Sequence, residues 1–160
     1  METQGFSFVE RELKFRYLSD GFYLRYKDYP EILQKNERPY SILVIEAYER
    51  KFAIPIRSHI NINNKDCFIT DSDKNSGLDF QKSIVVLDES FLNPVAFPTI
   101  NHSEFNAIKF KEAEIKEAFT KFLRSFISEY KRRKRNSKIP ESNRIKYSSL
   151  KYFINEIDNE

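Results

Sequence analysis

The chain is poor in the residues that build covalent, metal-bound or phosphate-binding sites. Cys67 is the single cysteine among 160 residues, so an internal disulfide is impossible and the usual thiolate zinc site is excluded. With three glycines in all, there is no Gly-rich phosphate loop. A His pair around a glutamate and a Gly-x-Ser-x-Gly elbow are also missing, which excludes the common zinc and serine hydrolase motifs. We expect no metal and no cofactor.

Long apolar runs are missing as well. The longest, Ile42–Ile45 and Ile84–Leu87, have the length of strands, whereas a bilayer span needs about 20 residues. The chain starts without the basic and apolar regions of a secretory signal. We therefore expect a cytoplasmic protein with no membrane partner, and residues 1–160 have the usual length of a single domain.

Charge of both signs is present but unevenly spread. Nine Lys or Arg and one Glu lie between Lys131 and Lys151, so this stretch carries about +8 and the rest of the +3 chain about −5. Such a basic stretch is an electrostatic footprint for phosphate, and hence for nucleic acid. The alternative is a solvated helix end, where cations favour the negative pole of the helix dipole.

Periodicity predicts strands in the N-terminal part of the chain. Apolar and polar residues alternate at Leu13–Tyr17, and the strongest β pattern is a hairpin of Tyr40–Ala47 and Lys51–Ile56 with a three-residue loop. Pro55 lacks an amide hydrogen and therefore suits a strand end or an edge. Further strands are expected at Asp66–Thr70, at Ser83–Leu87 after a turn at Gly77–Phe80, and, as a short extra strand, at Val95–Phe97.

From about Lys111 the apolar period becomes that of a helix. One stripe of this helix consists of Ile115, Phe119, Phe122, Phe126 and Tyr130. Shorter helices are expected at Gly21–Lys27, capped by Ser19 and Asp20, and at Ser149–Ile157, capped by Ser148. With residues about 10–98 rich in strands and about 103–157 helical, the chain predicts an α+β fold: a compact, bent antiparallel sheet or small barrel with packed helices.

Arg57, Ser58 and His59 stand together where the second hairpin strand ends, and loops at strand ends are common places for a site. The three groups suit metal-free cleavage of RNA, which supplies its own nucleophile as the 2′-OH. Imidazole moves protons near neutral pH, arginine offsets charge on the phosphate, and serine orients a phosphate oxygen. The alternative is a surface turn with a satisfied histidine.

Further candidates lie elsewhere in the chain. Arg38 opens the first hairpin strand and Lys82 precedes a buried strand, so both are candidate phosphate contacts; a loop charge and a snorkelling lysine are the alternatives. His102 could act with His59 as acid and base, or simply begin a helix at the surface. Cys67 stands in an apolar strand and is expected to be a buried small side chain rather than a nucleophile.

Three segments in order resemble the toxins of type III toxin–antitoxin systems, specifically the TenpN group related to ToxN: Arg38–Ala47 (RPYSILVIEA), Lys51–Ile60 (KFAIPIRSHI) and Asn75–Asp88 (NSGLDFQKSIVVLD). The resemblance covers roughly Leu13–Val95. It implies a compact fold similar to the MazF and Kid toxins and a metal-independent endoribonuclease that leaves a 2′,3′-cyclic phosphate and a 5′-hydroxyl. It also implies inhibition by a small repeat RNA, whose pseudoknots assemble with toxin into closed oligomers, and a role in abortive phage defence.

The residues of the family motif carry over unevenly. The strand-end pattern of the ToxN branch is Pro-x-Thr/Ser-Ser followed by a lysine. Pro55 and Ser58 match it, whereas Arg57 replaces the hydroxyl residue and Ile60 stands near the lysine position. The resemblance therefore implies that Arg57 and His59 do work that other residues do in the relatives.

RNA contacts are expected outside this motif as well. Arg38 matches the basic residue that opens the preceding strand in the family, and either Phe22 or Tyr23 matches the aromatic after the first strand. We expect Tyr23 and Tyr40 to contact RNA. For the antitoxin RNA we expect a basic groove lined by Lys131, Arg132, Arg133, Lys134, Arg135, Arg144 and Lys146. A non-catalytic RNA- or DNA-binding module, or a protein-interaction protein, are the alternatives.

Overall fold

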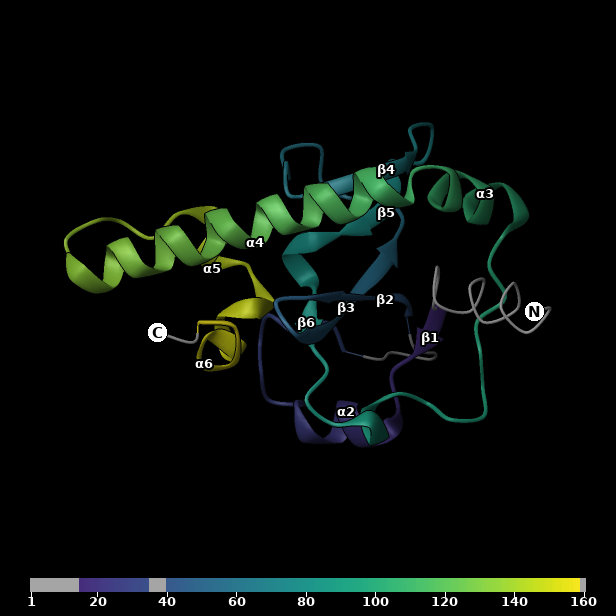
Figure 1. Cartoon of the computed structure of the whole chain (residues 1–160), viewed down its shortest axis with the longest axis horizontal. Coiled ribbons are helices and arrows are strands. Elements are labelled where there is room, and N and C mark those ends of the chain that lie inside the picture. The colour runs from purple at the N-terminus through teal and green to yellow at the C-terminus, as the bar shows by residue number, and fades with distance from the viewer. Residues whose placement is uncertain (1–14, 35–39, 159–160) are drawn as a thin grey trace.

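The computed structural model describes residues 15–34 and 40–158 (Figure 1). The strands are β1 (Phe15–Tyr17), β2 (Ser41–Ala47), β3 (Arg50–Arg57), β4 (Cys67–Asp71), β5 (Ser76–Asp79) and β6 (Ile84–Val85). The α-helices are α2 (Asp20–Arg25), α3 (His102–Phe110), α4 (Glu112–Arg135), α5 (Asn143–Lys146) and α6 (Ile154–Ile157), and the 3-10 turns are η1 (Phe80–Lys82), η2 (Glu89–Phe91) and η3 (Ser149–Phe153). The predicted α+β class is confirmed.

The strands form one antiparallel sheet in the order β1, β2, β3, β5, β4, and β6 also pairs with β3. Among the described residues the two end strands, β1 and β4, do not pair with each other, so the sheet is open. The small-barrel alternative is therefore not confirmed. In Figure 1, α4 runs across the sheet and its last turns project beyond it, whereas α2 lies on the opposite side of the view.

The β2–β3 hairpin forms as predicted, but its loop has two residues instead of three. Ala47 pairs with Arg50, which leaves Tyr48 and Glu49 between the strands. Both have positive φ, 51° and 62°, as in the type I′ turn whose twist matches that of paired strands. Positive φ costs a residue with a side chain about 1–2 kcal/mol. Tyr48 and Glu49 are therefore unusual in such a turn, and the local sequence predicts a longer loop. The long ladder on both sides offsets this cost.

Pro55 lies within β3 and not at its end, and the pairing explains why it is tolerated. The carbonyl of Lys51 accepts a bond from the amide of Val86, so alternate residues of β3, Pro55 included, direct their backbone polar groups toward the β6 and β5 side. On that side β6 pairs with residues 52 and 53 and β5 with residues 56 and 57. Pro55 falls in the gap between them, where no strand needs its missing amide hydrogen.

Between residues 76 and 97 two predictions are wrong and a third is confirmed only in part. Gly77–Asp79 were expected in a turn, but they belong to β5, which pairs with both β3 and β4. The expected strand Ser83–Leu87 is reduced to the two residues of β6. Val95–Phe97 form no strand, and Val95 is 83% exposed. Short β segments depend on partners from elsewhere in the chain, which local pattern does not contain.

The aromatic stripe of α4 is confirmed as the centre of the core. Phe119 is fully buried, and its ring meets Phe52 of β3 and Phe80 of η1 edge to face at centroid distances of 5.2 and 5.3 Å. Such T-shaped pairs add to the energy of burial. Ile115 and Phe126 are also buried on this stripe. The buried residues of the sheet, α4 and the C-terminal segments form one cluster.

The predicted caps Ser19 and Ser148 are confirmed, whereas Asp20 is the first residue of α2 and not its cap. The Ser19 hydroxyl accepts from the amide of Phe22 at the start of α2, and the Ser148 hydroxyl accepts from Leu150 at the start of η3. The expected helix Ser149–Ile157 is present as η3 followed by α6, and α5 was not predicted. Within the described residues, no helix has the length and apolar character needed to cross a membrane.

Candidate functional site

A polar cleft, called the β3 cleft below, opens where β3 ends. Its walls are the end of β3, the β4–β5 connection and the first turn of α3, and its volume is about 580 Å³. Its lining consists mainly of hydroxyl, charged and amide side chains: Ile56, Arg57, Ser58, Thr70, Asp71, Ser72, Lys74, Ser76, Asn101, Ser103 and Glu104. The fold thus brings two predicted catalytic residues, Arg57 and Ser58, into a cleft with polar groups from distant parts of the chain.

His59, the third member of the predicted cluster, supports the wall through its backbone. It has a φ of 57°, and its amide donates to the carbonyl of Lys74 at 3.1 Å. The amide of Ile60 donates to the carbonyl of Asn75, whose side-chain amide donates back to the carbonyl of Ile60. These bonds tie the end of β3 to the β4–β5 turn. The imidazole itself is exposed and does not line the cleft.

Arg57 is held by a buried carboxylate. Its Nη1 lies 2.6 Å from Oδ2 of Asp79 in β5, and the Asp79 side chain is 2% exposed. The Arg57 side chain is 30% exposed and lines the cleft. Among the described residues Asp79 is the only partner found for this guanidinium. Because a guanidinium has five N–H donors, the remaining donors are available to a ligand in the cleft.

Glu104 is a cleft residue that sequence patterns did not single out. Its Oε2 accepts a hydrogen bond from Oγ1 of Thr70 in β4 at 3.2 Å. The α3 helix begins after Asn101, whose Oδ1 accepts from the amides of Ser103 and Glu104. An Asn-x-x-Glu spacing signals a helix start and would have placed Glu104 in the first turn. Nothing in the local sequence shows that this turn faces the end of β3.

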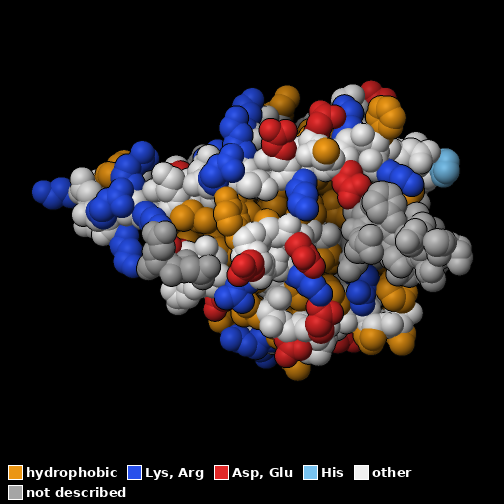
Figure 2. Space-filling view, viewed as in Figure 1, with side chains coloured by type: hydrophobic (Ala, Val, Ile, Leu, Met, Phe, Trp, Pro, Cys, Tyr) orange, Lys and Arg blue, Asp and Glu red, His pale blue; other side chains and the backbone are white. Residues whose placement is uncertain are grey.

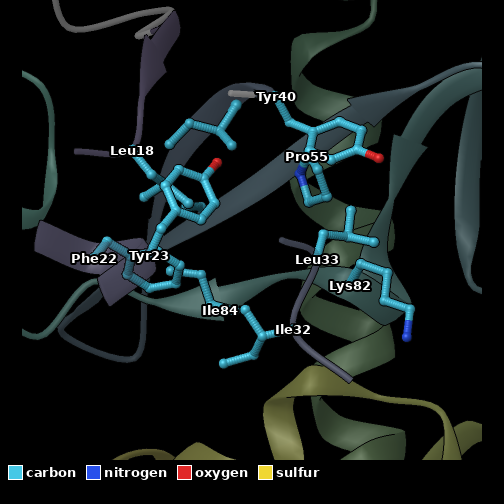
Figure 3. A pocket seen from close by; sticks show the side chains of 11 residues that line it. Leu18, Phe22, Tyr23, Ile32, Leu33, Tyr40, Pro55, Lys82 and Ile84 are labelled. Carbon is cyan, nitrogen blue, oxygen red and sulfur yellow. The ribbon is translucent and has the colours of Figure 1, made fainter. Parts of the chain in front are cut away.

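A second pocket holds three other predicted residues. Tyr23 of α2, Tyr40 just before β2 and Lys82 of η1 line it together with Pro55 (Figure 3). Its volume is about 20 Å³, which is room for roughly one water molecule, so a nucleobase does not fit inside it. Because Pro55 precedes Arg57 by two residues in β3, this pocket and the β3 cleft are neighbours along that strand.

The two tyrosines of this pocket differ in their burial and in the direction of their hydroxyls. Tyr23 is buried, and this burial raises the pKa of its phenol to about 12, an effect partly opposed by a hydrogen bond from the backbone amide of Tyr40. The Tyr40 side chain is half-buried, and Figure 3 shows its hydroxyl directed away from Tyr23. Phe22 also lines the pocket, so the structure does not separate the two candidates Phe22 and Tyr23.

The Lys82 ammonium is engaged in contacts that join separate segments. Nζ donates to the carboxylate of Glu31 at 2.8 Å, to the Glu31 carbonyl at 3.1 Å and to the Tyr147 carbonyl at 2.9 Å. In Figure 3 it points away from Tyr23 and Tyr40. Lys82 thus links the segment after α2 to the segment after α5, and the fold does not bring it into the lining of the β3 cleft.

Replacing Lys82 with methionine is expected to lower the free energy of unfolding by about 1–3 kcal/mol, because three oxygens lose their common donor. Urea unfolding followed by circular dichroism measures this change. Lys27→Met, at an exposed position after α2, is the control and should change stability by less than about 0.5 kcal/mol. Unchanged stability in Lys82→Met would contradict the structural role.

The predicted antitoxin groove is partly occupied by contacts within the protein. Arg144 holds Asp66 with two hydrogen bonds, Nε–Oδ2 at 3.0 Å and Nη2–Oδ1 at 2.9 Å, which raise the pKa of the Arg144 guanidinium. Lys131 lies 3.3 Å from a carboxylate oxygen of Asp158. The Nε of Arg133 donates to a backbone carbonyl in the turn after α4. These three cations stabilise the C-terminal packing.

The other cations of this group are exposed. Arg132, Lys134 and Arg135 lie at the end of α4, and Lys146 ends α5. Figure 2 shows Lys and Arg side chains gathered on the projecting end of α4, at the left of the view. No ion pair is found for Arg132, Lys134 or Arg135 within the described part of the chain. This projecting end is therefore a basic surface, separate from the β3 cleft.

Three remaining candidates lie outside both pockets. Arg38 lies outside the described residues. His102 is exposed at the first position of α3, as in the helix-start alternative, and does not line the cleft. Cys67 is half-buried and not fully buried as expected, its thiol donates to the carbonyl of Asn64, and partial burial raises the pKa of this thiol.

No group of three or more His, Cys, Asp or Glu side chains that could hold a metal ion is found over residues 15–34 and 40–158. No protein-family model, no curated protein and no solved structure matches the chain. We therefore infer the function from the residues of the β3 cleft.

Proposed function

We propose that this protein is a metal-independent endoribonuclease toxin of the type III kind, which cleaves RNA in the β3 cleft and leaves a 2′,3′-cyclic phosphate and a 5′-hydroxyl. One observation carries the proposal: Arg57, anchored on a buried carboxylate, and Glu104 line the same polar cleft. In metal-free transesterification of RNA a carboxylate can act as the general base, and a fixed cation offsets the charge that builds on the phosphate.

The roles follow from the chemistry of the lining residues. Glu104 accepts the proton of the 2′-OH as this oxygen attacks the neighbouring phosphorus. The free donors of Arg57 stabilise the negative charge that builds on the phosphoryl oxygens, where a preorganised guanidinium is most effective. The hydroxyl of Ser58 orients the phosphate, and the ammonium of Lys74 donates a proton to the leaving 5′-oxygen. Ser58 and Lys74 line the cleft with Arg57 and Glu104.

We also propose that the basic end of α4 binds RNA outside the cleft. Arg132, Lys134 and Arg135 are exposed there, and exposed cations bind a phosphate backbone without reading its sequence. The proposed partner at this surface is the repeat RNA antitoxin, a folded pseudoknot held in a closed toxin–RNA assembly. Such an RNA occupies the toxin in the cytoplasm until a phage infection releases it. The resemblance to the TenpN group and the basic surface support this part of the proposal.

A non-catalytic RNA-binding module is the second candidate, and the basic end of α4 favours it, because this surface binds phosphate whether or not the β3 cleft is catalytic. The two candidates share a ligand and differ in the product. A binding module loses affinity steeply with salt and leaves the RNA uncut, whereas a nuclease changes its length.

The test is cleavage of single-stranded RNA by the purified protein in EDTA, followed by analysis of the new ends. Cyclic phosphate and 5′-hydroxyl ends are expected. Glu104→Gln keeps the size of the side chain, removes the base and should lower kcat about 100-fold. Glu117→Gln, at an exposed position of α4, is the matched control and should retain full activity. Uncut RNA, or cleavage only with a divalent metal, would refute the proposal.

A further inference from the structure

Asp79 has an unusual environment for a carboxylate. It is almost fully buried at the end of β5, and both of its oxygens accept hydrogen bonds. Oδ2 accepts from Nη1 of Arg57 at 2.6 Å. Oδ1 accepts from Nδ2 of Asn64 at 3.1 Å and from the amide of Gln81 at 3.2 Å. Donors from three separate segments therefore fix the orientation of this carboxylate.

The fixed carboxylate determines where the Arg57 guanidinium lies. A free arginine side chain loses considerable rotamer entropy when it is ordered on a ligand. Here the folded chain orders it in advance, since Nη1 of the guanidinium contacts Asp79 while the Arg57 side chain lines the cleft. Groups held in place before the reaction need no reorganisation in the transition state.

We propose that Asp79, oriented by Asn64, is a positioning residue that aims the free donors of Arg57 at a phosphoryl oxygen of RNA in the β3 cleft. This inference rests on the proposed endoribonuclease function. Asp79 does not line the cleft, so it acts through Arg57 and has no contact with the substrate.

The test compares cleavage of RNA with cleavage of RNA that carries sulfur in place of one non-bridging oxygen at the cut site. Sulfur accepts hydrogen bonds from a guanidinium poorly, so the wild-type protein should cut the better-contacted sulfur isomer about tenfold more slowly than the oxygen substrate. Asp79→Asn should lower kcat about tenfold with KM within about twofold, and it should reduce this sulfur effect to near one. A purely structural role would lower both rates equally and leave the sulfur effect unchanged.

Two further tests keep the positioning role falsifiable if Asp79→Asn alone does not fold. Asn64→Ala keeps the buried ion pair and removes one of its orienting donors, so it should lower kcat about threefold and weaken the sulfur effect. In an Arg57→Gln background, Asp79→Asn should cause no further loss of kcat, because the residue through which it acts is absent.

The outcomes separate this inference from the function on which it rests. Suppose that the wild-type protein cuts RNA and that folded Asp79→Asn and Asn64→Ala both keep its sulfur effect. This result would overturn the positioning role but not the nuclease function. An additive loss in the Arg57→Gln background would overturn it as well. If the wild-type protein leaves RNA uncut in EDTA, both the nuclease and the positioning role are refuted.

Discussion

Replacing Gly77 with alanine is expected to destabilise the fold severely. Gly77 lies in β5, where it pairs with Arg57 of β3 on one side and with Ile69 of β4 on the other. A Cβ at this position would lie 2.1 Å from the backbone oxygen of Phe68 and 2.8 Å from the Cα of Ile69. Both are main-chain atoms of a paired strand, so no side-chain rotation relieves the clash.

The expected loss of unfolding free energy in Gly77→Ala is more than about 4 kcal/mol, a large part of the roughly 5–15 kcal/mol that stabilises a typical domain. Thermal unfolding followed by circular dichroism, or loss of soluble protein, measures it. Gly21→Ala in α2 is the matched control, because a Cβ there meets only the Ser19 hydroxyl at 3.5 Å. The control should be neutral or slightly stabilising. A cooperative Gly77→Ala protein with wild-type stability would show that β4 and β5 do not pack as described.

Replacing Phe119 with alanine is expected to cost about 3–5 kcal/mol of unfolding free energy. The Phe119 ring is fully buried, and it packs edge to face on Phe52 and Phe80 and stacks on Phe122 at a centroid distance of 6.1 Å. Its removal opens a cavity between α4, β3 and η1 that rigid neighbours fill only in part. Equilibrium unfolding in urea measures the change from the midpoint and slope of the transition.

Phe110→Ala is the control for this substitution. Phe110 is also a helical phenylalanine, at the end of α3, but it is 90% exposed. Its replacement should change stability by less than about 0.5 kcal/mol. Equal losses in the two variants would mean that α4 does not pack on the sheet through Phe119. The pair therefore tests the central layer of the fold with the chemistry of the substitution held constant.

The candidate site was predictable only in part. Arg57 and Ser58 were found because they follow a clear strand pattern and combine charge and hydroxyl groups within two residues. Asp79 was missed because it was placed in a turn and its partner is distant in sequence. Glu104 was missed because an Asn-x-x-Glu start reports a helix but carries no information about what the helix faces. His59 was predicted from its chemistry, whereas its positive φ and exposed imidazole depend on the β4–β5 turn.

Residue periodicity was sufficient for the parts of this protein that are stabilised by their own local pattern. The hairpin of β2 and β3 and the buried stripe of α4 follow from alternation and from helical spacing, because each side chain's burial depends on the geometry of its own element. The caps Ser19 and Ser148 follow from the same kind of local rule.

The tertiary arrangement settled the rest. The open strand order, the gap that accepts Pro55, the pairing of β5 and the cleft between β3 and α3 all depend on which distant segments meet. The physical reason is that a short strand needs a hydrogen-bonded ladder and a buried charge needs an opposite charge, and both partners come from distant parts of the chain. Arg57 shows both levels, since its place at a strand end is local, while the direction of its guanidinium depends on Asp79.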